Sequence, residues 1–330
     1  MLHEDKSIEP LFAETMKSIA RRADLKAYVE HNPQLYQLLR RAAARYVTGD
    51  DRRDGLEAAA SLTAQGYDVS LEYIGENTAT EAECEAAVRE LSGLIAELAG
   101  NRRKARVSFD LSHIGLSLHT DLALRNLLQL AEQAEPAGIE LFISMEESAK
   151  TDRVLDVYER SVARYPSSIG ITLQAQLHRT AADLAQRLPG NSLVRIVKGA
   201  YQESEQSALP RSEQLNRRYL ELVEHAILQG HRVSIATHDQ QIIDTILTRG
   251  WLSEGAAEFE MLYGIRTELS RKLKAAGHPV RIYLTYGSEW YLYICHRIAE
   301  HPPNLYRAVI DMASGESVDP VNSYAVSRDR

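Results

Sequence analysis

Four side chains capable of chemistry share one face of a helix that the sequence predicts near its C-terminal end. They follow the spacing i, i+3, i+4 and i+7: Tyr293, His296, Arg297 and Glu300. This spacing aligns them along one side of an α-helix. A phenol, an imidazole, a guanidinium and a carboxylate cannot be buried in an apolar core without polar partners. The face is therefore either a solvated surface or one wall of a binding site.

The segment before this helix favours the binding site. Residues 280–284 are rich in β-branched and aromatic side chains, so they are predicted to form a buried strand. Gly287 ends the strand, and Ser288 is a suitable N-cap for the helix that follows. Three aromatic residues near the turn would enclose a flat ligand: Tyr286, Trp290 and Tyr291.

Composition and charge exclude several classes of protein. Of the 330 residues, 44% are hydrophobic and 25% are charged, as in ordinary globular proteins. The formal charge of −8 gives no overall attraction to nucleic acid or to an anionic membrane. The two cysteines, Cys84 and Cys295, exclude a disulfide framework and a cysteine-rich zinc site. The sequence has no secretory signal and no run of about 18 apolar residues. We therefore expect a cytoplasmic protein without a transmembrane segment, or one bound peripherally to a membrane.

The order of the predicted elements indicates a (β/α)8 barrel of the TIM type. Residues 1–67 show helical patterns and no convincing strand, so they are predicted to form an N-terminal helical arm. Short apolar runs then alternate with helical patterns: 69–73, 106–111, 139–143, 169–173, 193–197, 233–236, 258–262 and 281–284. Eight strand–helix units in about 260 residues match a barrel in number and length, so we expect a distorted barrel over residues 68–330. A doubly wound sheet is the alternative, although the G-x-G-x-x-G sequence that would favour it is absent.

Polar residues gather at the C-terminal ends of the predicted strands, where barrel enzymes carry their active sites. They are Asp110 in the second strand, Ser144 and Met145 after the third, Gln174 after the fourth, Arg195 within the fifth, Lys198, Gly199, Ala200 and Tyr201 after it, and Thr237 and His238 after the sixth. Any one of these residues is more often structural than catalytic. Their convergence with the last helix indicates a site.

The residue types at this site point away from two common reactions. Metal-dependent hydrolysis lacks its usual sequences, H-x-H on a strand and H-E-x-x-H, so no metal site is expected. A nucleophilic serine is unsupported because G-x-S-x-G is absent. Arg195, Lys198 and the backbone of residues 199–200 can instead hold a phosphate-bearing cofactor. Side chains that can hydrogen-bond the edge of a planar heterocycle accompany them: Gln174, Thr237 and His238.

These blocks resemble the proline dehydrogenase family. The resemblance is carried by VRIVKGAYQE (194–203), IATHD (235–239), EFEMLYGIR (258–266) and RIYLTYGSEWYLYICHRIAEHPPN (281–304). Three further segments are similar to family segments: LEYIGE (71–76), RVSFDLSHIGLSL (106–118) and ISMEES (143–148). The resemblance covers about residues 65–310 in order, and the helical arm is similar to that of short, monofunctional members.

The resemblance implies a flavoenzyme with FAD across the strand ends and a small amine or amino acid as substrate. A hydride would pass to the flavin from the carbon beside the amine nitrogen, leaving an imine, and a quinone or oxygen would reoxidise the flavin. The implied cofactor contacts are Met145 (backbone), Gln174, Arg195, Lys198, Gly199, Ala200, Thr237 and His238. The implied substrate walls are Tyr201, Tyr283 and Tyr293. Arg297 would clamp a substrate carboxylate, and Glu300 would hold Arg297. The chain is also a candidate homo-oligomer.

Three positions of the substrate site depart from the family pattern. Asp110 stands where the family has lysine, Ser144 where it has aspartate, and His296 where it has the first of two adjacent arginines. The family set carries a charge of about +2, whereas the set here sums to about zero, or +1 if the imidazole is protonated. Losing one charge-assisted contact costs roughly 1.5–3 kcal/mol, and an imidazole lacks the planar fork of arginine. Binding of free proline should therefore be weakened.

The resulting hypothesis is a flavin-dependent amine or amino-acid dehydrogenase whose preferred substrate is not free L-proline. A substrate without a free carboxylate, or with an additional cation that Asp110 can pair, fits best. A genuine L-proline dehydrogenase that forms 1-pyrroline-5-carboxylate, with His296 protonated, is one alternative. A flavin-binding sensor or interaction protein without catalysis is another, and a barrel hydrolase without flavin is a third.

Overall fold

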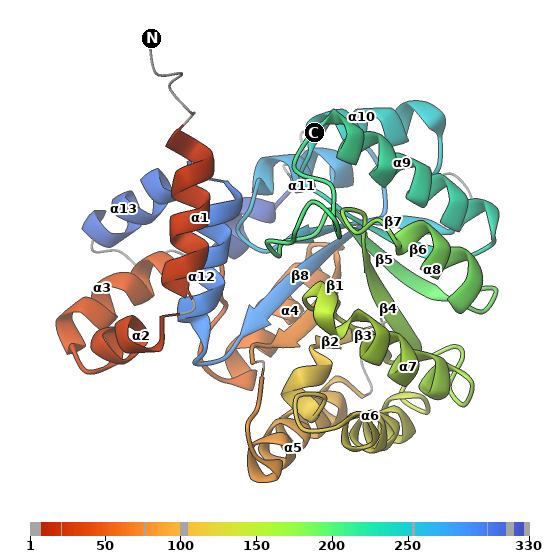
Figure 1. Ribbon diagram of the computed structural model, residues 1–330. Coiled ribbons are helices and arrows are strands. Elements are labelled where there is room, and N and C mark those ends of the chain that lie inside the picture. The colour runs from red at the N-terminus through yellow and green to blue at the C-terminus, as the bar shows by residue number, and fades with distance from the viewer. Residues whose placement is uncertain are drawn as a thin grey trace.

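The computed structural model describes residues 8–20, 22–75, 77–99, 105–252, 255–301, 303–314 and 320–326. Its eight strands are parallel and close into a barrel in sequence order (Figure 1). They are β1 (Asp68–Tyr73), β2 (Arg106–Phe109), β3 (Glu140–Ile143), β4 (Ile169–Gln174), β5 (Leu193–Val197), β6 (Arg232–Ala236), β7 (Ala257–Leu262) and β8 (Val280–Tyr286). Because β1 pairs with both β2 and β8, the predicted barrel is confirmed and the doubly wound sheet is excluded.

A helix follows each strand. These helices are α5 (Glu81–Leu98), α6 (Thr120–Ala134), α7 (Thr151–Val162), α8 (Thr180–Arg187), α9 (Glu213–Leu228), α10 (Gln240–Arg249), α11 (Thr267–Ala275) and α12 (Trp290–Glu300). Short 3-10 helices also occur: η1 (Leu111–Ile114), η2 (Ser148–Lys150) and η3 (Pro320–Tyr324). The N-cap position of helix α12 is Glu289, one residue later than predicted, and no side chain caps the helix. The expectation that Ser288 is the N-cap is therefore wrong.

Side chains alternate between the two faces of each strand, as a closed sheet requires. On β1, Val69 and Leu71 are buried in the main apolar core, which the surrounding helices complete. Ser70, between them, faces the inside of the barrel, where its hydroxyl donates to Glu260 at 2.7 Å. This alternation fixes which strand residues reach the interior of the barrel.

Four helices precede the barrel and one follows α12. They are α1 (Ile8–Ala20), α2 (Ala23–Glu30), α3 (Pro33–Ala43), α4 (Arg52–Ala64) and α13 (Asn304–Ser314). Helix α4 contacts β1 and β8, and its Ala59 and Leu62 belong to the main core. Helices α1, α3 and α13 pack instead on α12, in a second apolar cluster that contains Trp290 and Ile294. The division of the chain at residue 67 stays a prediction.

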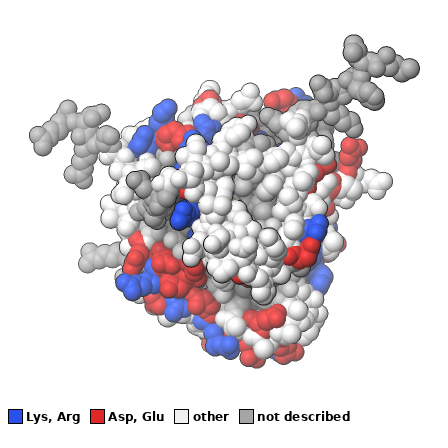
Figure 2. All heavy atoms as spheres, turned by 90° about the vertical axis from the view of Figure 1, so that its left-hand side faces the viewer, with Lys and Arg blue, Asp and Glu red and all other residues white. Residues whose placement is uncertain are grey.

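The outer side of this helical layer, which covers α12, is poor in charge. Figure 2 shows a broad area without charged side chains on this face, with the acidic and basic residues gathered mainly toward its edges. Its helices carry exposed large hydrophobic residues: Ile8, Leu11, Tyr28, Leu38, Tyr306, Val309 and Ile310. None of the helices in the described part of the chain combines the length and hydropathy needed to traverse a bilayer.

Candidate active site

Residues predicted for the site meet at the C-terminal end of the barrel, which we call the mouth. Ser108 and Thr172 face the interior, because both hydrogen-bond the guanidinium of Arg195. Two residues further along each strand lie Asp110 and Gln174, so the period of two places them in the uppermost interior layer. Ser144 is beside Asp110, since its amide donates to the Phe109 carbonyl at 3.0 Å.

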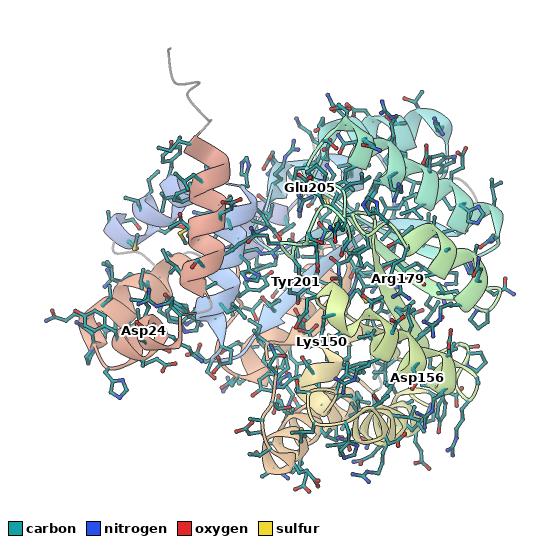
Figure 3. All side chains as sticks on the ribbon, in the orientation of Figure 1. Asp24, Lys150, Asp156, Arg179, Tyr201 and Glu205 are labelled. Atoms are coloured by element: carbon teal, nitrogen blue, oxygen red, sulfur yellow. The ribbon has the colours of Figure 1, made fainter. Side chains whose placement is uncertain are left out.

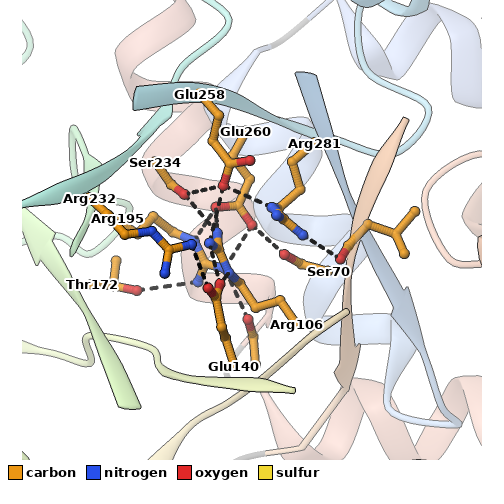
Figure 4. Close-up of polar contacts among 12 residues, drawn as sticks. Ser70, Arg106, Glu140, Thr172, Arg195, Arg232, Ser234, Glu258, Glu260 and Arg281 are labelled. Atoms are coloured by element: carbon orange, nitrogen blue, oxygen red, sulfur yellow. Dashed lines mark hydrogen bonds and ion pairs between the residues drawn. The ribbon is translucent and has the colours of Figure 1, made fainter. Parts of the chain in front are cut away.

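Arg195 is buried at the centre of the barrel (Figure 4). Its Nε and Nη2 donate to the two carboxylate oxygens of Glu260, each at 2.8 Å. Its guanidinium carbon is 4.7 Å from the ring centre of Tyr283 and 4.8 Å from that of Phe142. Burial opposes its charge, but Glu260 raises the pKa of Arg195 overall. Four of its five N–H groups have acceptors among the described residues, so one on Nη1 remains for a ligand.

The loop after β5 brings a cation and an open stretch of backbone to the mouth. Lys198 donates to Asp239 at 2.6 Å, and Asp239 also caps the N-terminus of α10. Gly199 has φ +112°, and a Cβ atom there would lie 2.3 Å from Gln176, so only glycine fits. The side chain of Arg211 donates to the Gly199 carbonyl at 2.5 Å. Tyr201 lies on the same loop, near the middle of the view in Figure 3.

His238 is a half-buried, neutral imidazole. Its Nε2 accepts from the amide of Leu262 at 3.1 Å, so the proton is on Nδ1. Burial, with a smaller contribution from Arg297, lowers the pKa of His238 to about 3. Nδ1 has no partner among the described residues. A buried donor without an acceptor is costly unless a ligand completes it.

Two side-chain amides link the chain segments at the C-terminal ends of β3, β4 and β5. Gln174 donates from Nε2 to the Glu146 carbonyl at 2.7 Å, and its Oε1 accepts from Gln176 at 3.1 Å. Gln176 also donates to the Tyr201 carbonyl at 3.1 Å. Gln174 is thus largely engaged by the protein. Met145, beside Glu146, is buried.

Helix α12 presents its polar face as the sequence predicts. Arg297 donates through Nη2 to Glu300 at 2.9 Å, and its guanidinium carbon is 4.8 Å from the ring centre of Tyr293. Its Nε is buried and has no partner among the described residues. Glu300 raises the pKa of Arg297 against the effect of burial. His296 is the neighbouring residue on the helix and is half-buried.

Two hollows recorded in the described structure lie away from the mouth. One, of about 530 Å³, is on the surface of α6 and α7 and is lined by Leu124, Arg125 and Arg164 among others. The other, of about 350 Å³, is at the N-terminal end of the strands beside Arg232 and Arg281. None of the predicted site residues lines either hollow.

The sequence and the fold were compared with known proteins. The family model described as proline dehydrogenase matches residues 55–300. Proline dehydrogenase 2 of Bacillus subtilis is 31% identical over 267 residues, which cover 80% of this chain and 88% of the relative. Proline dehydrogenase of Deinococcus radiodurans is 32% identical over 299 residues, which cover 87% of this chain and 96% of the relative.

The chain belongs to the proline dehydrogenase family. It is accordingly an oxidoreductase that acts on a CH–NH group. Proline utilization A from Bdellovibrio bacteriovorus has the same fold, with a TM-score of 0.72 at 15% identity over 97% of this chain and 45% of the other. The protein from Bradyrhizobium japonicum has a TM-score of 0.67 at 19% identity over 86% of this chain and 33% of the other.

Sequence reasoning missed several residues around the proline dehydrogenase site. Glu72 lies two positions beyond the inward-facing Ser70, and its charge raises the pKa values of Tyr283 and Tyr293, after the larger effect of burial. Glu260 holds Arg195 from below. Both are acids at inward positions of strands, and this alternation was the signal that could have found them. Arg211 lies in a loop and carried no such signal.

Proposed function

We propose that this protein is an FAD-dependent dehydrogenase that oxidises a C–N bond of an amine or amino acid other than free L-proline. The observation that carries the proposal is the charge at the mouth. Asp110 and Glu72 occupy inward positions at the ends of neighbouring strands, and the charge of Glu72 acts on Arg297 of α12, whose pKa it raises after the larger effects of burial, Glu300 and Tyr293. Two carboxylates at the mouth repel the negative charge of a free α-carboxylate, so they weaken its binding there.

Several donors at the mouth fit a flavin dinucleotide. Lys198 and the backbone of Gly199 and Ala200 would bind its phosphates, because cations and free amides suit anionic oxygens. The Nδ1–H of His238 would donate to an acceptor on the cofactor, which accounts for its lack of a partner among the described residues. The remaining contacts would come from Met145, Gln174, Arg195 and Thr237.

A bound flavin supplies the acceptor for the hydride, and the protein supplies orientation. Tyr201, Tyr283 and Tyr293 would hold the substrate ring or chain between aromatic walls. Arg297, fixed by Glu300, would bind one acidic group of the substrate. The reacting nitrogen must be neutral so that its lone pair assists hydride loss from the adjacent carbon.

The need for a neutral reacting nitrogen restricts the roles that Asp110 and Glu72 can have. A carboxylate stabilises the charged form of an amine, so an acid beside the reacting nitrogen would slow the reaction. Asp110 and Glu72 are better suited to a second cation, away from the carbon that is oxidised. We therefore infer that a substrate with an additional ammonium or guanidinium group is preferred to proline.

Anaerobic mixing tests the proposal. The purified yellow protein is mixed with L-proline, proline amide, pyrrolidine, ornithine and lysine, and bleaching of the flavin absorbance is followed in time. We expect faster bleaching by a dibasic amino acid or by proline amide than by proline. Bleaching by proline with the highest kcat/KM would overturn the specificity, and colourless protein that takes up no FAD would overturn the cofactor.

Authentic L-proline dehydrogenase activity is the second candidate. It is favoured by Arg297, whose Nε has no partner in the part of the chain that the structure describes and whose Nη2 pairs with Glu300, so that the guanidinium can bind a carboxylate. It requires His296 to be protonated, so that the imidazolium supplies a second positive charge for the substrate carboxylate. The same panel separates the two, since only this candidate ranks proline first.

A further inference from the structure

The carboxylate of Glu260 is buried at the middle of the barrel and holds Arg195 through two hydrogen bonds. Its side chain is 1% exposed. Oε2 accepts from Nε of Arg195 and Oε1 accepts from Nη2, both at 2.8 Å. Such a paired contact fixes the plane of a guanidinium as well as its position.

Other groups hold Glu260 from the opposite side (Figure 4). Ser70 donates to its Oε1 at 2.7 Å, and Arg106 donates to its Oε2 at 3.0 Å. Burial alone would favour the protonated acid, but Arg195 and then Arg106 lower its pKa far below the ordinary value. Glu260 is therefore ionised in the folded protein at neutral pH.

Arg195 has little freedom left once Glu260 is in place. Ser108 and Thr172 accept from its terminal nitrogens at 2.9 and 3.3 Å, and rings of Phe142 and Tyr283 lie on it. The two neutral hydroxyls contribute no charge. Glu260 is thus the partner that determines both the plane of the guanidinium and how much of its positive charge is cancelled.

We propose that Glu260 is a positioning residue, which orients Arg195 toward the bound flavin and moderates the positive charge that the flavin experiences. The inference rests on the proposed function, because it requires a flavin beside Arg195. Transfer of a hydride brings two electrons and one proton, so the flavin gains one negative charge. Arg195 stabilises that charge, and Glu260 offsets part of the stabilisation.

The charge-neutral variant Glu260→Gln tests this directly. It keeps the size of the side chain and one acceptor for Arg195, but it removes the negative charge. The reduction potential of the bound flavin should rise, with at least a tenfold change in the equilibrium constant for reduction, which equals about 30 mV for a two-electron couple. The potential is measured by equilibration with a reference dye, and the Kd for FAD by titration of the apoprotein.

Glu140→Gln is the matched control. Glu140 is also buried in the barrel, where Arg106 and Arg232 bind it at 2.9 and 2.6 Å, and it has no recorded contact with Arg195. The control removes the same charge from the same network, so its loss of stability should be similar. Its equilibrium constant for flavin reduction should change less than threefold.

The outcomes separate the inference from the function on which it rests. A shift in Glu260→Gln no larger than in Glu140→Gln would overturn the positioning role while FAD binding by the unaltered protein stands. An unaltered protein that cannot be loaded with FAD would overturn both. If Glu260→Gln does not fold, Arg106→Gln is added to each variant, so that the two double variants keep the interior charge and differ only in which glutamate is lost. A higher potential in the double variant without Glu260 is then expected, and equal potentials would reject the proposal.

Discussion

The two ends of the barrel differ in whether their buried polar side chains have protein partners. In the lower layers, Arg106 alone contacts three glutamates, at 2.9, 3.1 and 3.0 Å, and Arg281 binds both a carboxylate and the Val69 carbonyl. At the mouth, buried atoms of His238 and Arg297 have no partner among the described residues. Both ends carry charge, but only the lower one is internally satisfied.

This difference separates structural polarity from functional polarity. A buried ion pair offers little net stability over an apolar pair, yet removing one partner is expensive. The fold therefore depends on the lower network, because removing one partner would leave a buried charge unpaired. Unsatisfied donors at the mouth instead cost stability and persist where a ligand completes them, which agrees with the proposed flavin and substrate contacts.

Arg106→Met should give the largest effect, on stability. It leaves Glu140, Glu258 and Glu260 short of a buried cation, so the free energy of unfolding should fall by about 3–5 kcal/mol. Urea denaturation followed by circular dichroism measures it. Arg53→Met is the control, because Arg53 and Glu57 form a pair that is 84% and 65% exposed, and such exposed pairs contribute little to stability. Equal losses in the two variants would contradict the distinction.

Arg297→Lys, at the mouth, should lower activity much more than stability. Lysine keeps the charge but loses the planar fork and the free Nε, so kcat/KM should fall by a factor that corresponds to roughly 1.5–3 kcal/mol. The free energy of unfolding should change by less than about 1 kcal/mol. Steady-state kinetics and urea denaturation on the same preparation measure both quantities. A loss of stability with unchanged kcat/KM would place Arg297 among the structural residues.

The two ends also differ in how well the sequence predicts them. The strands followed from eight regular alternations, and the mouth residues from their position at strand ends. Closure of the barrel was the favoured alternative to a doubly wound sheet, and the pairing of β1 with β8 decided it. The lower network was not foreseen, because Arg106, Glu258 and Arg281 occur within runs that otherwise read as strands. Which charges meet across a barrel depends on the stagger between strands, and a single sequence does not contain that information. The missing cap at Ser288 is a similar local case, since tertiary packing of α12 determines where the helix begins.

Restoring the family side chains at the mouth sharpens the comparison further. The triple variant Asp110→Lys, Ser144→Asp and His296→Arg should raise kcat/KM for proline by more than the product of the three single effects. Asp110 and Ser144 are adjacent across β2 and β3, and residues that share one site couple by about 0.5–3 kcal/mol. Kinetics of all single, double and triple variants measure the coupling. Strictly additive changes would show that the three positions act independently.

His113 provides a test of another kind, through the pH dependence of stability. Its ring is buried beside Tyr73, with centres 5.1 Å apart, and burial lowers the pKa of His113 from 6.5 to about 4. Below pH 6.5 the unfolded chain binds a proton at His113, whereas the native protein binds that proton only below about pH 4. The free energy of unfolding therefore falls with pH across this window, by up to about 1.4 kcal/mol per pH unit for one proton.

His113→Gln removes that proton uptake. Between about pH 4 and 6.5, its free energy of unfolding should depend on pH less steeply than that of the unaltered protein, by about 1.4 kcal/mol per pH unit at most. Urea denaturation at intervals of half a pH unit measures the slope. His178→Gln is the control, because His178 is exposed and its Nε2–H donates to the Glu205 carbonyl at 3.0 Å. If both variants keep the original slope, the buried imidazole near the mouth is not what makes the barrel sensitive to acid.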